Sequence, residues 1–310
     1  GAGGGQLLTC DDVLLTEFAV LNTKGDGIKS KGADRIVYYK LRVEWTAGPK
    51  ETSGAYGIYP VESSDVLIDS VFVRGASDAG IYVGQSKNIV VRDSIATENV
   101  AGIEIENSYD ADVHDNIATK NTGGILVFDL PSLPMQGGHN VRVLENIVND
   151  NSTPNFAPKG NIVASVPTGT GVLIMANRNV EVFDNVFDQN GTGNVMIVGY
   201  RYEHKDPKYQ PLPKGIVVRG NQHGKAGYAP KFPGGDMIAT ALGGSIPPVL
   251  WDGAGDAIVL DKVGVLSLNL PDVKAPQSEA KPAPADLSKG TPPPALPVIK
   301  LPDAMEAKVR

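Results

Sequence analysis

Hydrophobic and polar residues alternate with a period of two along most of the chain. In one clear stretch, Ile103 and Ile105 alternate with Glu104 and Glu106. A period of two is typical of short β-strands that bury one face. No stretch before residue 270 shows a sustained helical stripe, so we predict an all-β fold for this part of the chain.

The alternating stretches belong to an internal repeat. A glycine followed by isoleucine recurs at spacings of 23, 22 and 22 residues, at Gly57, Gly80, Gly102 and Gly124. Each start is followed by a three-residue pattern: an acidic residue, then Ser or Asn, then an aliphatic residue. In the later rungs an asparagine follows, and these asparagines recur as a column at Asn99, Asn121, Asn151 and Asn190. Three short strands with a turn at each corner describe one rung of a parallel β-helix.

Such a rung is stable only when it is stacked on others. Stacking about 4.8 Å apart pairs the backbones and buries continuous columns of Ile, Val and Leu. Asparagine tolerates the left-handed conformation of a corner and can hydrogen-bond the asparagine of the next rung. We therefore interpret the asparagine columns as structural ladders.

Three parts are expected along the chain. Residues 1–224 are predicted to form about eight rungs, residues 225–270 to form further rungs or a cap, and residues 271–310 to form an extended Pro-rich tail or strap. A short helix is expected around residues 303–309.

Three insertions interrupt the repeat, at residues 129–139, 152–170 and 199–215. In repeat proteins, insertions gather on one side and often form the binding face.

Composition narrows the classes of partner. The formal net charge of −7 argues against binding to nucleic acid. No apolar run of about 18 residues is present, so no transmembrane segment is predicted. The single cysteine excludes a disulfide scaffold. No basic or apolar leader region precedes the repeat, so the chain is expected to be a mature or trimmed form.

Several longer strings resemble a bacterial family of exported, right-handed parallel β-helix repeat proteins with a pectin-lyase-like fold. The resemblance covers about residues 5–260 and rests on GAYGIYPV (54–61), SDAGIYVGQS (77–86), VAGIEIENS (100–108), TGGILVFDLP (122–131) and GNIVASVPTGTG (160–171). It implies a right-handed helix and a periplasmic, cell-surface or secreted location. It also implies a c-type cytochrome as a partner, because such proteins are often encoded beside one, and it assigns no activity.

The wider β-helix class contains polysaccharide lyases, epimerases and glycoside hydrolases, but their signatures are missing here. The Asp-Pro-His-Asp string of mannuronan epimerases is absent, as is the Gly-His-Gly that follows paired aspartates in polygalacturonases. Whether the chain is an enzyme of one of these classes stays open, because a fold alone does not assign chemistry.

The outer face of the first sheet carries the best candidate site. Alternation aligns Tyr59, Tyr82 and Glu104, with Glu106 on the same strand as Glu104. Tyrosine faces suit sugar rings, and two carboxyl groups on one face of a strand could act as acid and base. Two solvated charges on an open acidic face are the alternative interpretation.

The remaining candidates surround this pair. Gln85, Asn107 and Asp129 form a corner column that could bind hydroxyl groups, and Lys159 in the second insertion could act beside the carboxyl groups. Of these positions, Glu104, Glu106 and Lys159 are the catalytic candidates, and Tyr59, Tyr82, Gln85, Asn107 and Asp129 are the binding candidates. Glu104, Glu106 and Asp129 would also suit Ca²⁺, the one cofactor considered.

Two functions remain from the sequence. The first is an exported protein that binds, and could process, an extracellular or cell-envelope polysaccharide on the outer face of the first sheet. The second is a non-catalytic scaffold that self-assembles or partners a c-type cytochrome. Oligomeric state is left open.

Overall fold

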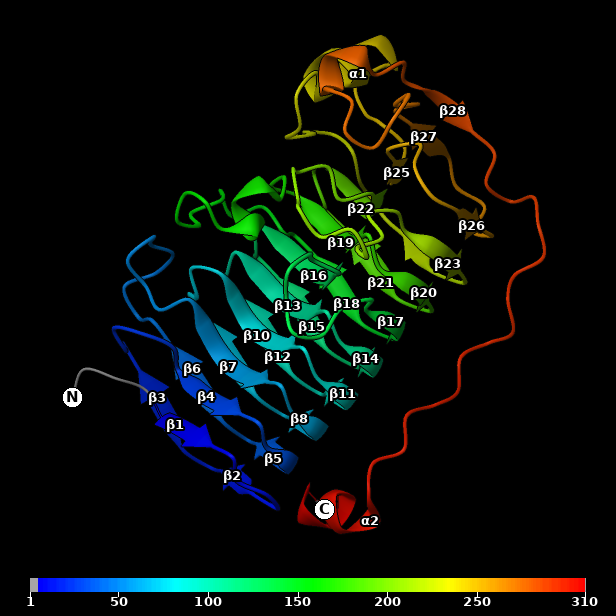
Figure 1. Cartoon of the computed structure of the whole chain (residues 1–310). Coiled ribbons are helices and arrows are strands. Elements are labelled where there is room, and N and C mark those ends of the chain that lie inside the picture. The colour runs from blue at the N-terminus through cyan, green and yellow to red at the C-terminus, as the bar shows by residue number, and fades with distance from the viewer. Residues whose placement is uncertain (1–4, 310) are drawn as a thin grey trace.

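Residues 5–309 are described in the computed structural model, and they form three long sheets that wind around one core. Every strand pairs in parallel with the strand one rung away, except β28, which pairs antiparallel with β27 (Figure 1). The predicted all-β parallel β-helix is confirmed.

The first sheet has 11 strands: β1 Gly5–Leu8, β4 Ile28–Lys31, β7 Tyr56–Val61, β10 Ala79–Gly84, β13 Ala101–Glu106, β16 Gly123–Phe128, β19 Thr170–Met175, β22 Gly193–Val198, β25 Val249–Trp251, β27 Val265–Ser267 and β28 Ala283–Ala285. The second sheet has nine: β2 Leu14–Thr16, β5 Asp34–Tyr39, β8 Ser64–Asp69, β11 Lys87–Arg92, β14 Tyr109–His114, β17 His139–Leu144, β20 Arg178–Phe183, β23 Lys214–Arg219 and β26 Ala257–Val259. The third sheet has eight: β3 Ala19–Leu21, β6 Arg42–Glu44, β9 Phe72–Arg74, β12 Ile95–Thr97, β15 Ile117–Thr119, β18 Ile147–Asn149, β21 Val186–Asp188 and β24 Gln222–His223.

The repeated glycines let neighbouring rungs approach closely. A Cβ atom on Gly102 would lie 2.5 Å from the carbonyl oxygen of Gly124 and 2.8 Å from the side-chain nitrogen of Asn121. No side chain fits there without moving the next rung. The glycine of each rung start is therefore required by backbone packing.

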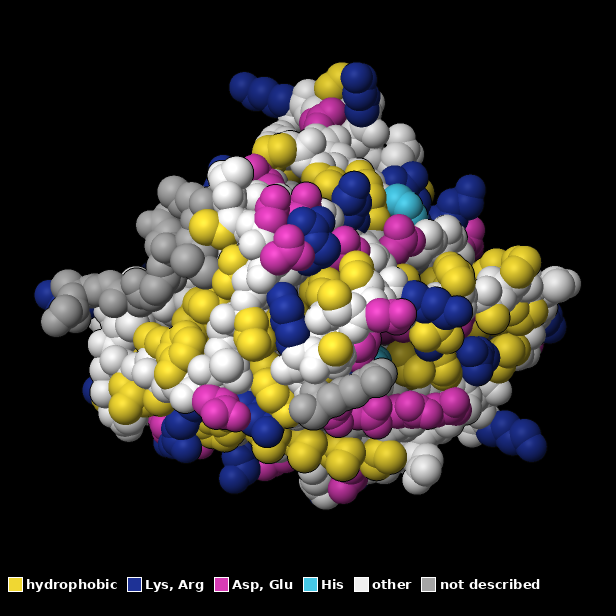
Figure 2. All heavy atoms as spheres, turned by 90° about the horizontal axis from the view of Figure 1, so that it is seen from below, with side chains coloured by type: hydrophobic (Ala, Val, Ile, Leu, Met, Phe, Trp, Pro, Cys, Tyr) yellow, Lys and Arg dark blue, Asp and Glu magenta, His cyan; other side chains and the backbone are white. Residues whose placement is uncertain are grey.

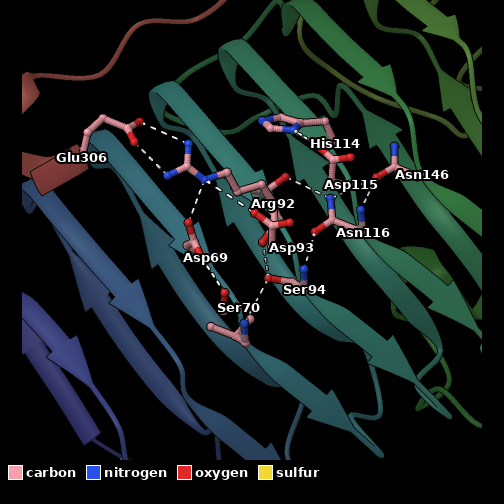
Figure 3. A network of polar contacts seen from close by, with 12 residues as sticks. Asp69, Ser70, Arg92, Asp93, Ser94, His114, Asp115, Asn116, Asn146 and Glu306 are labelled. Carbon is pink, nitrogen blue, oxygen red and sulfur yellow. Dashed lines mark hydrogen bonds and ion pairs between the residues drawn. The ribbon is translucent and has the colours of Figure 1, made fainter. Parts of the chain in front are cut away.

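Asparagine side chains hydrogen-bond from rung to rung beside these glycines. Asn99 Nδ2 donates to Asn121 Oδ1 (3.0 Å), and Asn121 Nδ2 donates to Asn151 Oδ1 (3.1 Å). A second column runs through Asn116 and Asn146, both labelled in Figure 3, with Asn116 Nδ2 donating to Asn146 Oδ1 at 3.0 Å. These amides pair buried backbone groups where the chain turns a corner.

Side chains of one kind also stack on the outside of the coil, and Figure 2 shows rows of acidic and hydrophobic side chains on one face. The register of the third sheet aligns Ile95, Ile117, Ile147 and Val186. Parallel rungs of equal length place equivalent positions above one another, which produces such rows.

The helices lie outside the repeat. They are α1 Gly235–Ala241, α2 Asp303–Glu306 and the 3₁₀ turns η1 Ile162–Ser165, η2 Gln277–Glu279 and η3 Ala307–Val309. The prediction of no helix before residue 270 missed α1, whose seven residues are too few for a recognisable stripe. None of the helices within residues 5–309 is long and apolar enough to cross a membrane.

The C-terminal segment returns along the second sheet to the start of the coil (Figure 1). The backbone N–H groups of Leu296 and Ile299 donate to Glu181 Oε1 (2.9 Å) and Asp112 Oδ2 (3.0 Å). In α2, Glu306 Oε2 lies 2.8 Å from Arg92 Nη2, and Arg92 also contacts Asp69 (Figure 3). The tail is thus attached to several rungs.

Candidate functional site

Two carboxyl groups lie on the outer face of the first sheet, beneath the insertions of residues 129–139 and 152–170, which together form a roof over this face. Glu104 and Glu106 are both on β13, and they are only 1% and 7% exposed. The second insertion packs over this face, because Val163 belongs to one buried cluster with Leu126, the neighbour of Glu104 in the next rung, and Asn161 lines a cleft together with Glu106. The alternative of two solvated charges is therefore wrong, because sequence alternation gives the face of a strand but not what packs over it.

Three tyrosines pack against these carboxyl groups. The ring centroid of Tyr82 lies 4.6 Å from that of Tyr56 and 5.0 Å from that of Tyr59, and the Tyr82 hydroxyl donates to Glu106 Oε1 at 2.7 Å. Tyr82 is 4% exposed, so its face is not available to a sugar ring, contrary to the expectation. Tyr59 is half-buried, with the Lys29 ammonium 4.3 Å from its ring centroid.

A third buried carboxyl group, Asp78, lies in the same region. Its Oδ2 accepts a hydrogen bond of 2.8 Å from Asn161 Nδ2 in the second insertion, and it also hydrogen-bonds Tyr56. Sequence reasoning missed both Asp78 and Tyr56. The sequence contains one signal for Asp78. It stands two residues before a repeat glycine, and the next two rungs have the uncharged residues Val100 and Thr122 at this position.

Burial raises the pKa of all three carboxyl groups. For Glu106, burial raises the pKa to about 7, against the opposing effect of the Tyr82 hydrogen bond. For Asp78, burial raises the pKa to about 6, although Asn161 and Tyr56 hydrogen-bond it. Burial, helped by repulsion from Glu106 and Asp78, raises the pKa of Glu104 well above its usual range. The cluster therefore holds protons near neutral pH and can give or take them there.

Glu104 is the most isolated member of the cluster. Among the described residues, neither of its carboxyl oxygens has a hydrogen-bond partner. An ionised carboxylate without partners is costly in the interior, so the neutral acid is the stable form.

An open cleft of about 550 Å³ lies beside Glu106. Its walls come from all three insertions, through Leu130, Asn161, Tyr200 and Tyr202 among others. Tyr202 is 42% exposed, and its ring centroid lies 5.5 Å from that of Tyr200. These two tyrosines present the accessible aromatic surface that was expected of Tyr82.

The corner residues have structural roles. Asn107 is fully buried, and its Nδ2 donates to the carbonyl oxygens of Leu130 (2.8 Å) and Met135 (2.9 Å). Asp129 Oδ1 accepts from the Gly138 N–H at 2.8 Å. Both side chains are occupied in holding the first insertion, which corrects the expectation that they face a ligand. Gln85 is buried at a corner with φ of 51°.

The expected metal ligands are not arranged as a group. No cluster of three or more His, Cys, Asp or Glu side chains within residues 5–309 is arranged to hold a metal ion. The Asp129 carboxylate is bonded to Gly138, although it lies near enough to Glu106 to repel it. Lys159 is exposed next to Gly160, which lines the cleft.

The comparisons with known proteins concern the fold. The family described as right handed beta helix region matches residues 26–206, which is more than half of the chain. The chain belongs to this family. No curated protein sequence matches it.

Two solved structures follow a similar chain path. The A-module of the mannuronan C-5 epimerase AlgE4 of Azotobacter vinelandii has a TM-score of 0.44 and 10% identity, over 84% of this chain and 76% of that one. The A-module of AlgE6 from the same organism has a TM-score of 0.40 and 11% identity, over 83% and 72%. At these values the likeness says nothing about the chemistry of this right-handed β-helix protein.

Proposed function

We propose that the protein binds a polysaccharide in the cleft above the first sheet, and that the carboxyl cluster can exchange protons with it. The observation that carries the proposal is the placement of Glu106 in the lining of an open cleft whose wall includes the exposed Tyr202. An aromatic face stacks on a sugar ring, and carboxyl and amide groups hydrogen-bond hydroxyl groups.

The geometry gives each residue a distinct part. Tyr202 and Tyr200 would hold a sugar ring, and Asn161 would fix the roof through Asp78. Glu106, with a pKa of about 7, would accept or give a proton at the substrate, while Glu104 would act as the neutral acid behind it. Lys159 in the roof is the candidate to neutralise a uronate carboxylate. Lyase, epimerase and hydrolase chemistry all use such proton transfers.

Binding is tested by retention in affinity gels that contain polymannuronate, polygalacturonate or dextran. We expect one of these polymers to retard the protein, and Tyr202→Ala to reduce retention at least about tenfold if the ring stacks on a sugar. Tyr228→Ala is the matched control, because the Tyr228 hydroxyl donates a hydrogen bond to the Gln189 carbonyl oxygen outside the cleft. Equal retention of the two variants would remove the cleft as the binding site.

Processing is tested on the polymer that binds. Elimination is followed by the absorbance of unsaturated uronates, hydrolysis by reducing ends, and epimerisation by incorporation of solvent deuterium. Each assay is run with Ca²⁺ and with a chelator, which also tests the calcium hypothesis. A reaction that Glu106→Gln abolishes, with binding retained, would support processing. Binding without turnover would limit the function to recognition.

The scaffold function predicts a different result. A protein that only partners a c-type cytochrome or self-assembles should bind none of the polymers, and it should form a complex with the cytochrome or with itself in sedimentation experiments. An exported location fits either function, and it is tested by fractionating cells that express the protein from its own gene.

A further inference from the structure

The outer face of the first sheet changes character beyond the carboxyl groups. The register places Leu126, Leu173, Met196 and Leu250 in the column that follows Glu104. In the column that follows Glu106 it places Phe128, Met175 and Val198. The same sheet therefore has a polar, acidic region in its N-terminal rungs and an aliphatic, Met-containing region in its C-terminal rungs.

A second cavity, of about 250 Å³, lies over this apolar region. Its floor and walls include Phe128, Leu173, Met175, Met196 and Phe232. Ser165 and Tyr202 line both this cavity and the cleft beside Glu106, so the two are neighbours. Flexible methionines adapt to ligands of different shape, which suits a binding pocket better than a rigid core.

Charged residues line the same cavity. Arg201 and Lys231 are cationic, and Arg201 Nη2 is fixed by a 2.7 Å hydrogen bond to the Ala275 carbonyl oxygen. Asp252 also lines the cavity, but its carboxylate oxygens accept from the N–H groups of Gly199 (2.7 Å) and Ala254 (2.8 Å). Asp252 lies near enough to Arg201 to attract it and offsets part of its charge, so the lining keeps an excess of one positive charge, with the exposed Lys231 as the cation left for an anion.

We propose that this cavity binds an apolar carboxylate, an acyl or aryl acid whose hydrophobic part has roughly ten non-hydrogen atoms. A cavity of about 150 Å³ lined by aliphatic side chains holds benzene, so the larger cavity here takes a larger apolar group. The hydrophobic part would lie on Leu173 and Met196, and the carboxylate would face Lys231. This inference does not depend on polysaccharide binding in the adjoining cleft.

The test uses the full chain and the fluorescent acid 2-naphthoate, whose ring system matches the proposed size of the apolar part, displaced by decanoate, decanol or decyltrimethylammonium. We expect saturable binding, with decanoate displacing best and the cation worst. Met196→Trp fills the cavity and should weaken binding at least about tenfold. Lys231→Gln should weaken decanoate about threefold and leave decanol unchanged, because an exposed charge contributes modestly.

The controls distinguish binding in the cavity from non-specific hydrophobic binding and from loss of the fold. Val298→Gln removes an apolar side chain that is 62% exposed on the C-terminal segment, and it should change nothing. If Met196→Trp does not fold, the proposal is tested by two other variants. Leu173→Phe fills less of the cavity and should also weaken binding, and Lys231→Gln should weaken the binding of decanoate but not of decanol. Equal displacement by decanoate and decyltrimethylammonium, or full affinity in a folded cavity-filling variant, would overturn the proposal. Polymer retention by the folded Met196→Trp protein shows separately whether the cleft functions.

Discussion

At the residue scale, the buried carboxyl cluster makes stability depend on pH. The pKa of Glu106 is about 7 in the folded protein against an ordinary value of 4.5, so the folded state binds this proton more tightly than the unfolded state. Its contribution is complete below pH 4.5 and is lost as pH rises toward 7, a loss of about 3 kcal/mol at most. Glu106→Gln should make this slope shallower in urea unfolding measured from pH 4.5 to 8, and Glu104 and Asp78, whose pKa values are also raised, should keep part of it. Glu203→Gln, with its side chain 92% exposed, should leave the slope as it is.

The asparagine columns lead to a second prediction for single residues. Asn146 Nδ2 donates to the Val113 carbonyl oxygen (2.9 Å), and Asn146 Oδ1 accepts from the Asn116 N–H (3.0 Å). Asn146→Ala leaves both backbone groups buried and unpaired, so we expect a loss of about 2–4 kcal/mol in the free energy of unfolding. Asn149→Ala is the control, since Asn149 Oδ1 has no hydrogen-bond partner among the described residues. Equal losses in the two variants would show that the column adds no specific stability.

At the scale of elements, the first insertion depends on one corner side chain. Asn107 stands at a corner with φ of 48°, and its side chain makes two hydrogen bonds to the Leu130 backbone. Asn107 Oδ1 accepts from the Leu130 N–H, and Asn107 Nδ2 donates to the Leu130 carbonyl oxygen. Asn107→Gly keeps the left-handed corner but removes these bonds. We expect faster hydrogen exchange over residues 130–138 and weaker polymer retention. Asn88→Gly, at a position near the start of β11 that also has a positive φ, of 57°, should change neither. Unchanged exchange in Asn107→Gly would mean that the insertion is held by its other contacts.

The elements that sequence could predict are those fixed by local repetition. The alternation and the 22-residue spacing align Tyr82 with Glu104 and Glu104 with Leu126, and the observed register has these pairs. The packing of the roof over the sheet could not be predicted from the sequence. Contacts such as that between Asn161 and Asp78 join residues 83 positions apart, and they follow no repeat. Without the roof, neither the burial of Glu104 nor the exposure of Tyr202 could be inferred.

At the scale of the whole molecule, the C-terminal segment connects rungs that otherwise contact only their neighbours. Leu301 and Met305 pack against Val37, Leu67 and Val90 of the second sheet. At the far end of the segment, the Leu287 carbonyl oxygen accepts from the Val259 N–H at 2.9 Å. Stacked repeats unfold as a chain of nearest-neighbour units unless something couples their ends. We therefore predict that the tail acts as a strap that couples the first rungs to the last.

Met305→Asp tests this coupling, because the Met305 side chain is 1% exposed and a charge cannot remain in its pocket. The loss of its packing should cost about 2–5 kcal/mol, and the freed tail should no longer hold the terminal rungs together. Urea unfolding should then change from one transition to two, and proteases should cleave within residues 286–302 before the coil unfolds. Val298→Asp alters the same segment at an exposed position and should keep the single transition. If Met305→Asp releases the tail to proteases while the coil still unfolds in one unshifted transition, cooperativity resides in the stacked rungs themselves.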